Sequence, residues 1–256
     1  SVLMIIYLFP LTILADEFKN LFDGKTHDIT LPEIVELIER RDKSVKHFRL
    51  EDGSIMAVQY QVPIHNLDSK GVWQDIDNTL LKHKNIYATE NQRITFDTSG
   101  SGNSLFTLQD NEYKIIMGVE TNISRYSIKV DNPKTVSEKN LNKTLSTLND
   151  DEKTKVAIER ATTLDKLSSS IKYEDVFDGV DIEYVLIANN IKENIIVKER
   201  KANYSYSFSL RLENLTASID DKNEITLLDS TTGETVYTIP AGYIRCPFTL
   251  YSHPCL

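Results

Sequence analysis

Apolar and polar residues alternate with a period of two over much of the chain, which is typical of β-strands with one buried face. The alternation is strictest over residues 204–212. Residues 46–50 and 55–60 also alternate, and the Asp52-Gly53 pair between them is a turn signal. These two runs predict a β-hairpin.

Shorter runs with the same character fill most of the remaining chain and are separated by turn residues. They predict strands at residues 72–76, 93–96, 104–108, 113–118, 126–130, 180–186, 191–198, 224–228 and 235–239. Many short strands of this kind pack as a sandwich or an open barrel. The sequence therefore predicts a mainly β fold, with antiparallel sheets arranged like a β-sandwich.

One segment near the N-terminus has the 3.6-residue period of a helix instead. Its apolar positions, spaced i, i+3, i+4 and i+7, are Leu31, Ile34, Val35 and Ile38. Thr30 and Glu33 have capping-box spacing at its start. We expect one N-terminal helix here, with an ion pair between Glu36 and Arg40 on its opposite face.

Residues 131–169 differ from the strand-rich segments on either side because they are densely charged and contain no aromatic residue. Residues 151–167 could form a helix with Ala157, Ala161 and Leu164 on one face. We expect a helical or loop insertion at the surface rather than part of a core.

The ends of the chain suggest how it is organised. Residues 2–15 carry no charge and are too short for a transmembrane helix, which needs about 20 apolar residues. Ala15 before Asp16 fits a signal-peptide cleavage point, although a buried core segment is the alternative. We predict a secreted chain with four parts: a signal-peptide remnant (1–15), a lead-in and helix (16–45), a β-rich domain (46–243) forming one sandwich or two lobes, and an atypical tail (244–256).

Composition is ordinary for a folded domain but acidic. The chain has 256 residues, 40% hydrophobic and 26% charged, and a formal net charge of −9. This charge disfavours nucleic acid and anionic membrane surfaces as partners, because both attract basic proteins. The two cysteines, Cys246 and Cys255, could bridge each other but are too isolated to form a disulfide framework.

An acidic run is the most tempting candidate for chemistry, and it comprises Asp175, Asp178, Asp181 and Glu183. Asp181 and Glu183 share a strand face, as a pair of glycosidase carboxylates could. Oxygen ligands at this density could also bind calcium. We favour the solvated face of a half-buried strand, and predict no catalytic, cofactor or metal site.

Other motifs are weaker. Gly24-Lys25-Thr26 resembles the end of a phosphate loop, but Lys19 stands where the first glycine is required. His47 and His65 could approach each other across strands, although surface positions are the simpler interpretation. Trp73 suits a core position better than an exposed sugar-stacking platform, and both interpretations stay open.

Several strings, in this order, are similar to a known module. They are residues 65–80 (HNLDSKGVWQDIDNTL), 173–184 (YEDVFDGVDIEY), 192–196 (KENII), 232–234 (TGE) and 239–241 (IPA). The chain resembles the N-terminal module of secreted, wall-associated YD/Rhs-repeat proteins of Gram-positive bacteria, which often carry a following DNRLRE domain. Gly242 departs from the proline usual in that family, and Arg245-Cys246-Pro247 replaces an acidic continuation.

The resemblance implies a non-catalytic extracellular module for structure or display, whose partners are the following domains of the same protein. It supplies no catalytic residue and no cofactor, and implies no membrane contact after signal cleavage. A carbohydrate-binding sandwich that uses Trp73 to bind cell-wall glycan is the main alternative. A glycoside hydrolase built on Asp181 and Glu183 is the third interpretation.

Overall fold

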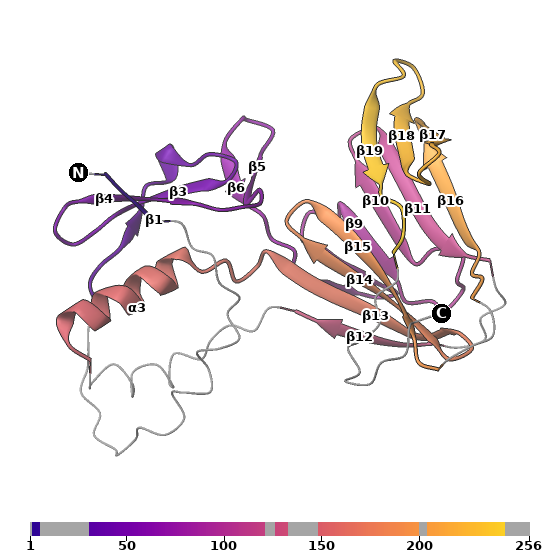
Figure 1. Cartoon of the computed structure of the whole chain (residues 1–256), viewed down its shortest axis with the longest axis horizontal. Helices are drawn as coiled ribbons and strands as arrows, with labels where there is room; N and C mark the ends of the chain where they lie inside the picture. Colours follow the sequence, from indigo (N-terminus) through magenta and orange to yellow (C-terminus); the bar gives the residue numbers. More distant parts are fainter. Residues whose placement is uncertain (1, 6–30, 121–125, 133–147, 200–203, 244–256) are drawn as a thin grey trace.

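A computed structural model describes residues 2–5, 31–120, 126–132, 148–199 and 204–243 of the chain. The described part is mostly antiparallel sheet with one α-helix, so the predicted mainly β, sandwich-like fold is confirmed. A small sheet and the helix lie at one end of the molecule, and the sandwich lies at the other (Figure 1). No helix in the described part is long and apolar enough to cross a membrane.

The sandwich has one large sheet and two smaller ones. The six-stranded sheet contains β7 (Leu81–His83), β8 (Ile86–Ala88), β9 (Ile94–Asp97), β10 (Phe106–Asp110), β11 (Tyr113–Val119) and β16 (Phe208–Glu213). The four-stranded sheet contains β12 (Ser127–Asp131), β13 (Ser168–Phe177), β14 (Val180–Ile187) and β15 (Asn190–Val197). The three-stranded sheet contains β17 (Leu215–Ile219), β18 (Ile225–Asp229) and β19 (Thr235–Ile239).

Both smaller sheets cover the same face of the six-stranded sheet. Phe106 and Tyr113 lie on that face, because the pairing of Phe106 with Met117 and the strand period of two place them together. The Phe106 ring contacts Tyr184 of the four-stranded sheet, with ring centres 5.0 Å apart. The Tyr113 hydroxyl donates to Oδ2 of Asp229 in the three-stranded sheet at 2.6 Å.

Aromatic residues fill the interface between the two larger sheets. Tyr173 and Tyr184 are fully buried, with ring centres 6.2 Å apart. The Tyr173 hydroxyl donates to the carbonyl oxygens of Asp97 (3.0 Å) and Leu105 (2.7 Å), so burial leaves this polar group satisfied. These bonds fix β13 against the end of β9 and the start of β10.

β13 is the longest strand in the described chain, and periodicity did not predict it. The inward residues Ser169, Ile171 and Tyr173 alternate, but the next buried residue is Val176. A bulge lies between Tyr173 and Phe177 in the pairing with β14 and shifts the alternation by one residue. Because the bulge interrupts the alternation, a search for a period of two does not identify this strand.

The predicted N-terminal helix over residues 31–38 is wrong. The segment contains β2 (Val35–Glu36) and a single 3-10 turn, Ile38–Arg40, while Thr30 of the expected cap lies outside the described residues. Val35 pairs with Arg49 of the neighbouring strand. Eight residues are too few for a stable helix in isolation, so strand pairing overrides the apolar spacing.

β2 belongs to a small sheet with β1 (Val2–Ile5), β3 (Val45–Arg49) and β4 (Ile55–Gln59), and the predicted hairpin is formed by β3 and β4. Residues 2–5, which fall in the predicted signal-peptide remnant, pair in parallel with β4. A separate two-stranded hairpin follows, made of β5 (His65–Leu67) and β6 (Trp73–Asp75). Residues 6–30 and the predicted tail 244–256 lie outside the described residues.

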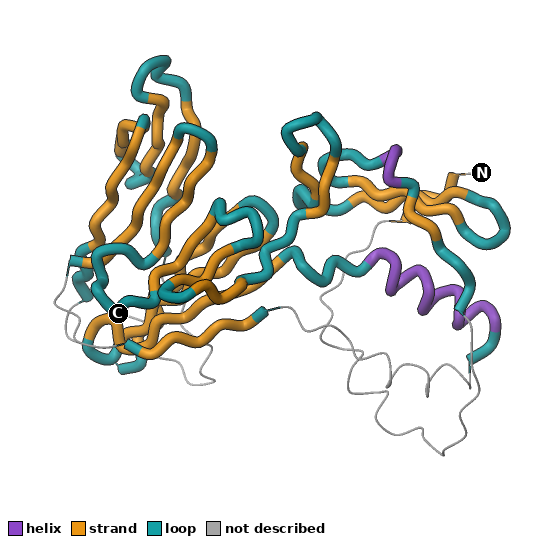
Figure 2. The backbone as a smooth tube through the Cα atoms, turned by 180° about the vertical axis from the view of Figure 1, so that it is seen from behind, coloured by secondary structure: helices purple, strands orange, loops and turns teal. Residues whose placement is uncertain are grey.

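The helix predicted at 151–167 is present as α3 (Asp150–Thr162), and Leu164 lies beyond its end. It begins with a capping box in which Asn149 and Glu152 bond each other's main-chain N–H groups. Ile158 and Ala161 pack against the small core formed by Phe48, Met56 and Val58. The helix therefore runs along the N-terminal sheet and helps to bury it (Figure 2).

Asn78 joins the N-terminal part to the sandwich. Its side-chain amide is buried and donates to the carbonyl oxygens of Leu167 (2.7 Å) and Ala188 (2.9 Å). Its own carbonyl accepts from the Ser169 hydroxyl at 2.6 Å. The side chain and main chain of Asn78 thus tie the segment after β6 to one end of the β13–β14 pair, where β13 begins and β14 ends.

Replacing Asn78 by alanine should lower the free energy of unfolding by about 1–3 kcal/mol, because the buried carbonyl oxygen of Ala188 loses the side-chain amide as its donor. Urea unfolding followed by circular dichroism would measure the change. The exposed Asn85→Ala serves as the control and should change stability by less than about 0.5 kcal/mol. Equal stability of the two variants would show that the Asn78 bonds do not stabilise the contact between the N-terminal part and the sandwich.

Candidate functional site

Asp181 and Glu183 lie on the outer face of β14, where Glu183 pairs with Lys172 of β13. Asp181 is not solvated as expected, because it is only 4% exposed. Its Oδ1 accepts from the Lys198 ammonium at 2.6 Å and from the main-chain N–H of Asp175 at 2.9 Å. The solvated-face interpretation is therefore wrong for Asp181, whose carboxylate lies near Lys172 of β13 and Lys198 just after β15.

The electrostatics of Asp181 oppose a role as a proton donor. Burial raises the pKa of its carboxyl group, but the bonds from Lys198 and the Asp175 amide outweigh burial and leave the pKa lowered. The carboxylates of Asp175 and then Asp181 accept hydrogen bonds from Lys198 and raise its pKa. A general acid needs a raised carboxyl pKa, so Asp181 is an ionised partner in a salt bridge instead.

The contacts of Asp181 and Lys198 stabilise the bulge in β13. Asp175 has a left-handed backbone, with φ of 58°, which is uncommon for a residue other than glycine. Its N–H is bound by Asp181 and its carboxylate by Lys198 at 2.7 Å. The acidic run thus stabilises a strained backbone position.

Two further groups complete this outer-face ion network. Glu174 binds Lys129 and the Ser127 hydroxyl, each at 2.6 Å, and the lysine bond leads in lowering its pKa to about 2. Glu183 accepts from the side-chain amide of Asn194 at 2.9 Å. The described residues include no group of three or more histidine, cysteine, aspartate or glutamate side chains placed to hold a metal ion.

A second polar cluster, which sequence reasoning missed, lies between β2, β3 and the β5–β6 hairpin. We call it the hairpin cluster, and its members are Glu36, Arg41, Lys46, His65 and Asp75. Arg41 binds Glu36 at 2.6 Å and Asp75 at 2.9 Å. Lys46 binds Asp75 at 2.7 Å and Glu36 at 3.3 Å. The two basic side chains are mostly buried, and they bridge carboxylates from two sheets.

His65 completes the hairpin cluster. It is fully buried, with Nδ1 at 2.6 Å from the carbonyl oxygen of Asp42. Its Nε2 lies 3.4 Å from Oδ1 of Asp75. Burial raises the pKa of Asp75, but Lys46, Arg41 and His65 lower it more, so the carboxyl group stays ionised.

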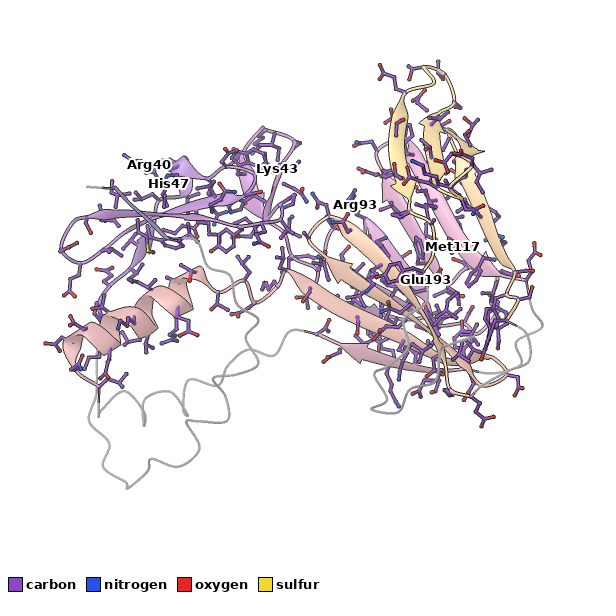
Figure 3. The ribbon with its side chains drawn as sticks, viewed as in Figure 1. Arg40, Lys43, His47, Arg93, Met117 and Glu193 are labelled. Carbon is purple, nitrogen blue, oxygen red and sulfur yellow. The ribbon has the colours of Figure 1, made fainter. Side chains whose placement is uncertain are left out.

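His47 of β3, the other histidine considered, has Nδ1 2.9 Å from the carbonyl oxygen of Arg40 (Figure 3). Gly24-Lys25-Thr26 and both cysteines lie outside the described residues. His47 is partly exposed, whereas the expected surface position is wrong for His65, which is fully buried.

Trp73 is half-buried and belongs to neither hydrophobic cluster of the described residues, contrary to the favoured core position. It pairs across the hairpin with Leu67, which is 55% exposed. Val72 beside it is also exposed. The tip of the hairpin therefore presents apolar side chains to solvent.

Hydrogen bonds between tyrosine hydroxyls and carboxylates connect strands of the sandwich. Tyr237 donates to Asp110 at 2.9 Å, and Arg93 binds the same carboxylate oxygen at 2.7 Å. Burial and then Asp110 raise the pKa of Tyr237 to about 12.

Tyr184 donates to Glu193 at 2.6 Å within the sandwich (Figure 3). Burial raises the pKa of Glu193, but its hydrogen-bond partner is a tyrosine rather than the second carboxylate that a glycosidase needs.

Comparison with models of known protein families found no match, and searches of curated proteins and of solved structures found no similar protein. The expected relation to wall-associated repeat proteins therefore stays a prediction from the sequence strings.

Replacing Asp181 by asparagine should lower the free energy of unfolding by about 2 kcal/mol at pH 7, because a buried, charge-assisted bond is lost. The folded pKa of Asp181 is below its unfolded value of about 3.9, so its stabilising effect is present above that pH and disappears as pH falls through the folded pKa. Urea unfolding between pH 7 and pH 3 should show the wild type and the variant converging below about pH 4.

The exposed Asp221→Asn is the matched control, and it should follow the wild type at every pH. A constant gap between wild type and D181N across this range would contradict the ionised state assigned to Asp181.

Proposed function

We propose that the chain is a non-catalytic structural module for display outside the cell, belonging to a secreted, wall-associated repeat protein. Its partners are then the following domains of the same protein. The cell wall or the extracellular space is its location, and it needs neither a cofactor nor a nucleic acid.

One observation carries this proposal: the strings behind the family resemblance supply the internal polar networks of the fold. Residues 65–80 contribute His65 and Asp75 to the hairpin cluster. They also contribute Asn78, whose side chain bonds the β13–β14 pair. Residues 173–184 contribute Asp175 and Asp181 to the bulge. Side chains that stabilise the chain internally suit a module whose role is to hold a shape.

A carbohydrate-binding role is the second candidate, and the hairpin tip favours it. Trp73 is partly exposed and lies beside the exposed Leu67 and Val72. Aromatic side chains with an apolar face and a polar tip are common in binding surfaces. A glycoside hydrolase is a weaker candidate, because Asp181 is ionised and held by Lys198.

Trp73 is the single tryptophan, so its fluorescence reports on the hairpin alone. For a structural module we expect no change in emission when the purified chain is titrated with soluble cell-wall glycan, with or without calcium. The chain should also resist limited proteolysis and release no sugar from the glycan.

The variant Trp73→Ala provides the comparison for binding to insoluble wall, which is measured by co-sedimentation. Saturable binding that disappears in this variant would replace the structural proposal with the carbohydrate-binding one. Release of sugar that stops in D181N or Glu183→Gln would establish the glycosidase instead.

A further inference from the structure

β15 is an edge strand with unusual features. Within the described residues, β14 is its one hydrogen-bonded neighbour. It has eight residues, whereas the other edge strands, β16, β12 and β7 among them, have six or fewer. Its pairing with β14 is uninterrupted from Val197 to Asn190, so the free edge is regular along its whole length.

The free edge presents main-chain hydrogen-bonding groups at every second residue. The N–H of Lys198 donates to the carbonyl oxygen of Gly179 at 3.0 Å, so even-numbered residues of this strand point toward β14. The outward N–H and C=O groups are therefore those of Ile191, Glu193, Ile195 and Val197. Such a row is a template for another strand.

Exposed apolar side chains accompany these groups at one end of the strand. Ile195 is 42% exposed, and Ile196 and Val197 are each 37% exposed. Ile195 and Val197 point to the inner face of the sheet and Ile196 to the outer face, as the strand period requires. An added strand would cover apolar surface on both faces.

We propose that β15 pairs antiparallel with β15 of a second copy of this chain, around a twofold axis at Asn194. In this register Ile191 lies opposite Val197 of the second copy, and Glu193 lies opposite Ile195 of the second copy. All four outward residues then form hydrogen-bonded pairs, and the two four-stranded sheets join into one. The proposal does not depend on the wall-associated function.

Charge selects this register over its neighbours. Moving the axis to Glu193 places two glutamates directly opposite each other, and moving it to Ile195 places Lys192 opposite Lys198 of the second copy. Like charges at directly opposed positions destabilise a sheet. The axis at Asn194 brings two neutral amides together and puts Lys192 opposite Ile196 of the second copy.

Light scattering coupled to size exclusion tests the assembly with the full chain, loaded from 1 to 200 µM. We expect the mass to rise with concentration from 29.2 kDa toward twice that value. Ile195→Pro removes an outward N–H without removing a bond to β14, and should weaken the dimer at least tenfold. Ile195→Lys should act in the same way, whereas Ile219→Lys, at an exposed isoleucine of β17, should leave the dimer intact.

A cysteine placed on the axis tests the register. In a chain with Cys246→Ser and Cys255→Ser, Asn194→Cys should form a disulfide-linked dimer on mild oxidation, because non-hydrogen-bonded pairs have Cα atoms about 4.5 Å apart. Lys192→Cys should not, because two copies of residue 192 would lie about 13 Å apart along the strands.

Circular dichroism of each variant checks that the chain still folds. A wild type that is monomeric at 200 µM overturns the proposal, even if a foreign strand binds β15. A dimer unaffected by either folded Ile195 variant, or equal cross-linking at positions 192 and 194, overturns it as well.

Discussion

The apolar face of the six-stranded sheet sets the architecture, because it must be removed from water and no single partner sheet covers it. The four-stranded sheet covers it through Tyr173 and Tyr184, and the three-stranded sheet covers it near Tyr113. Burying an aromatic side chain is among the largest favourable contributions in a fold of this size. Each tyrosine also brings a hydroxyl group that needs a partner, which explains why carbonyl or carboxylate oxygens accompany these rings.

The same requirement explains where charged residues lie. A buried charge is costly unless it is paired and hydrogen-bonded, and the chain places such pairs where separate pieces of backbone meet. Asp181 meets Lys198 at the bulge, and Asp75 meets Lys46 where the β5–β6 hairpin joins the N-terminal sheet. Asp181 and Lys46 are the buried members of these two pairs, so replacing Lys198 or Asp75 removes a charged partner from a group that water cannot reach. Acidic residues that suggest catalysis in the sequence therefore serve to align strands.

Sequence reasoning succeeds where neighbours along the chain determine the structure. Alternation identifies β14, and the helical spacing of Ala157 and Ala161 identifies α3, because both signals are local. It fails at β13, where the left-handed Asp175 breaks the alternation, and at β2, where pairing with β3 overrides a short apolar stripe. The hairpin cluster was missed for a related reason. Glu36, Arg41 and Asp75 are ordinary surface residues in sequence, and only the pairing of two sheets brings their charges within 3 Å.

Incomplete coverage of the four-stranded sheet links its packing to its edge. The inner face of β15 carries Glu193, whose carboxyl group is bound by Tyr184, and then the exposed Ile195 and Val197. An inward-pointing charge protects an edge strand from unwanted pairing, but here the tyrosine hydroxyl binds it and burial raises its pKa. That protection is weakest at the end of the strand where the isoleucine and valine side chains are most exposed. The same tyrosine that completes the core therefore leaves the edge of the sandwich open to another strand.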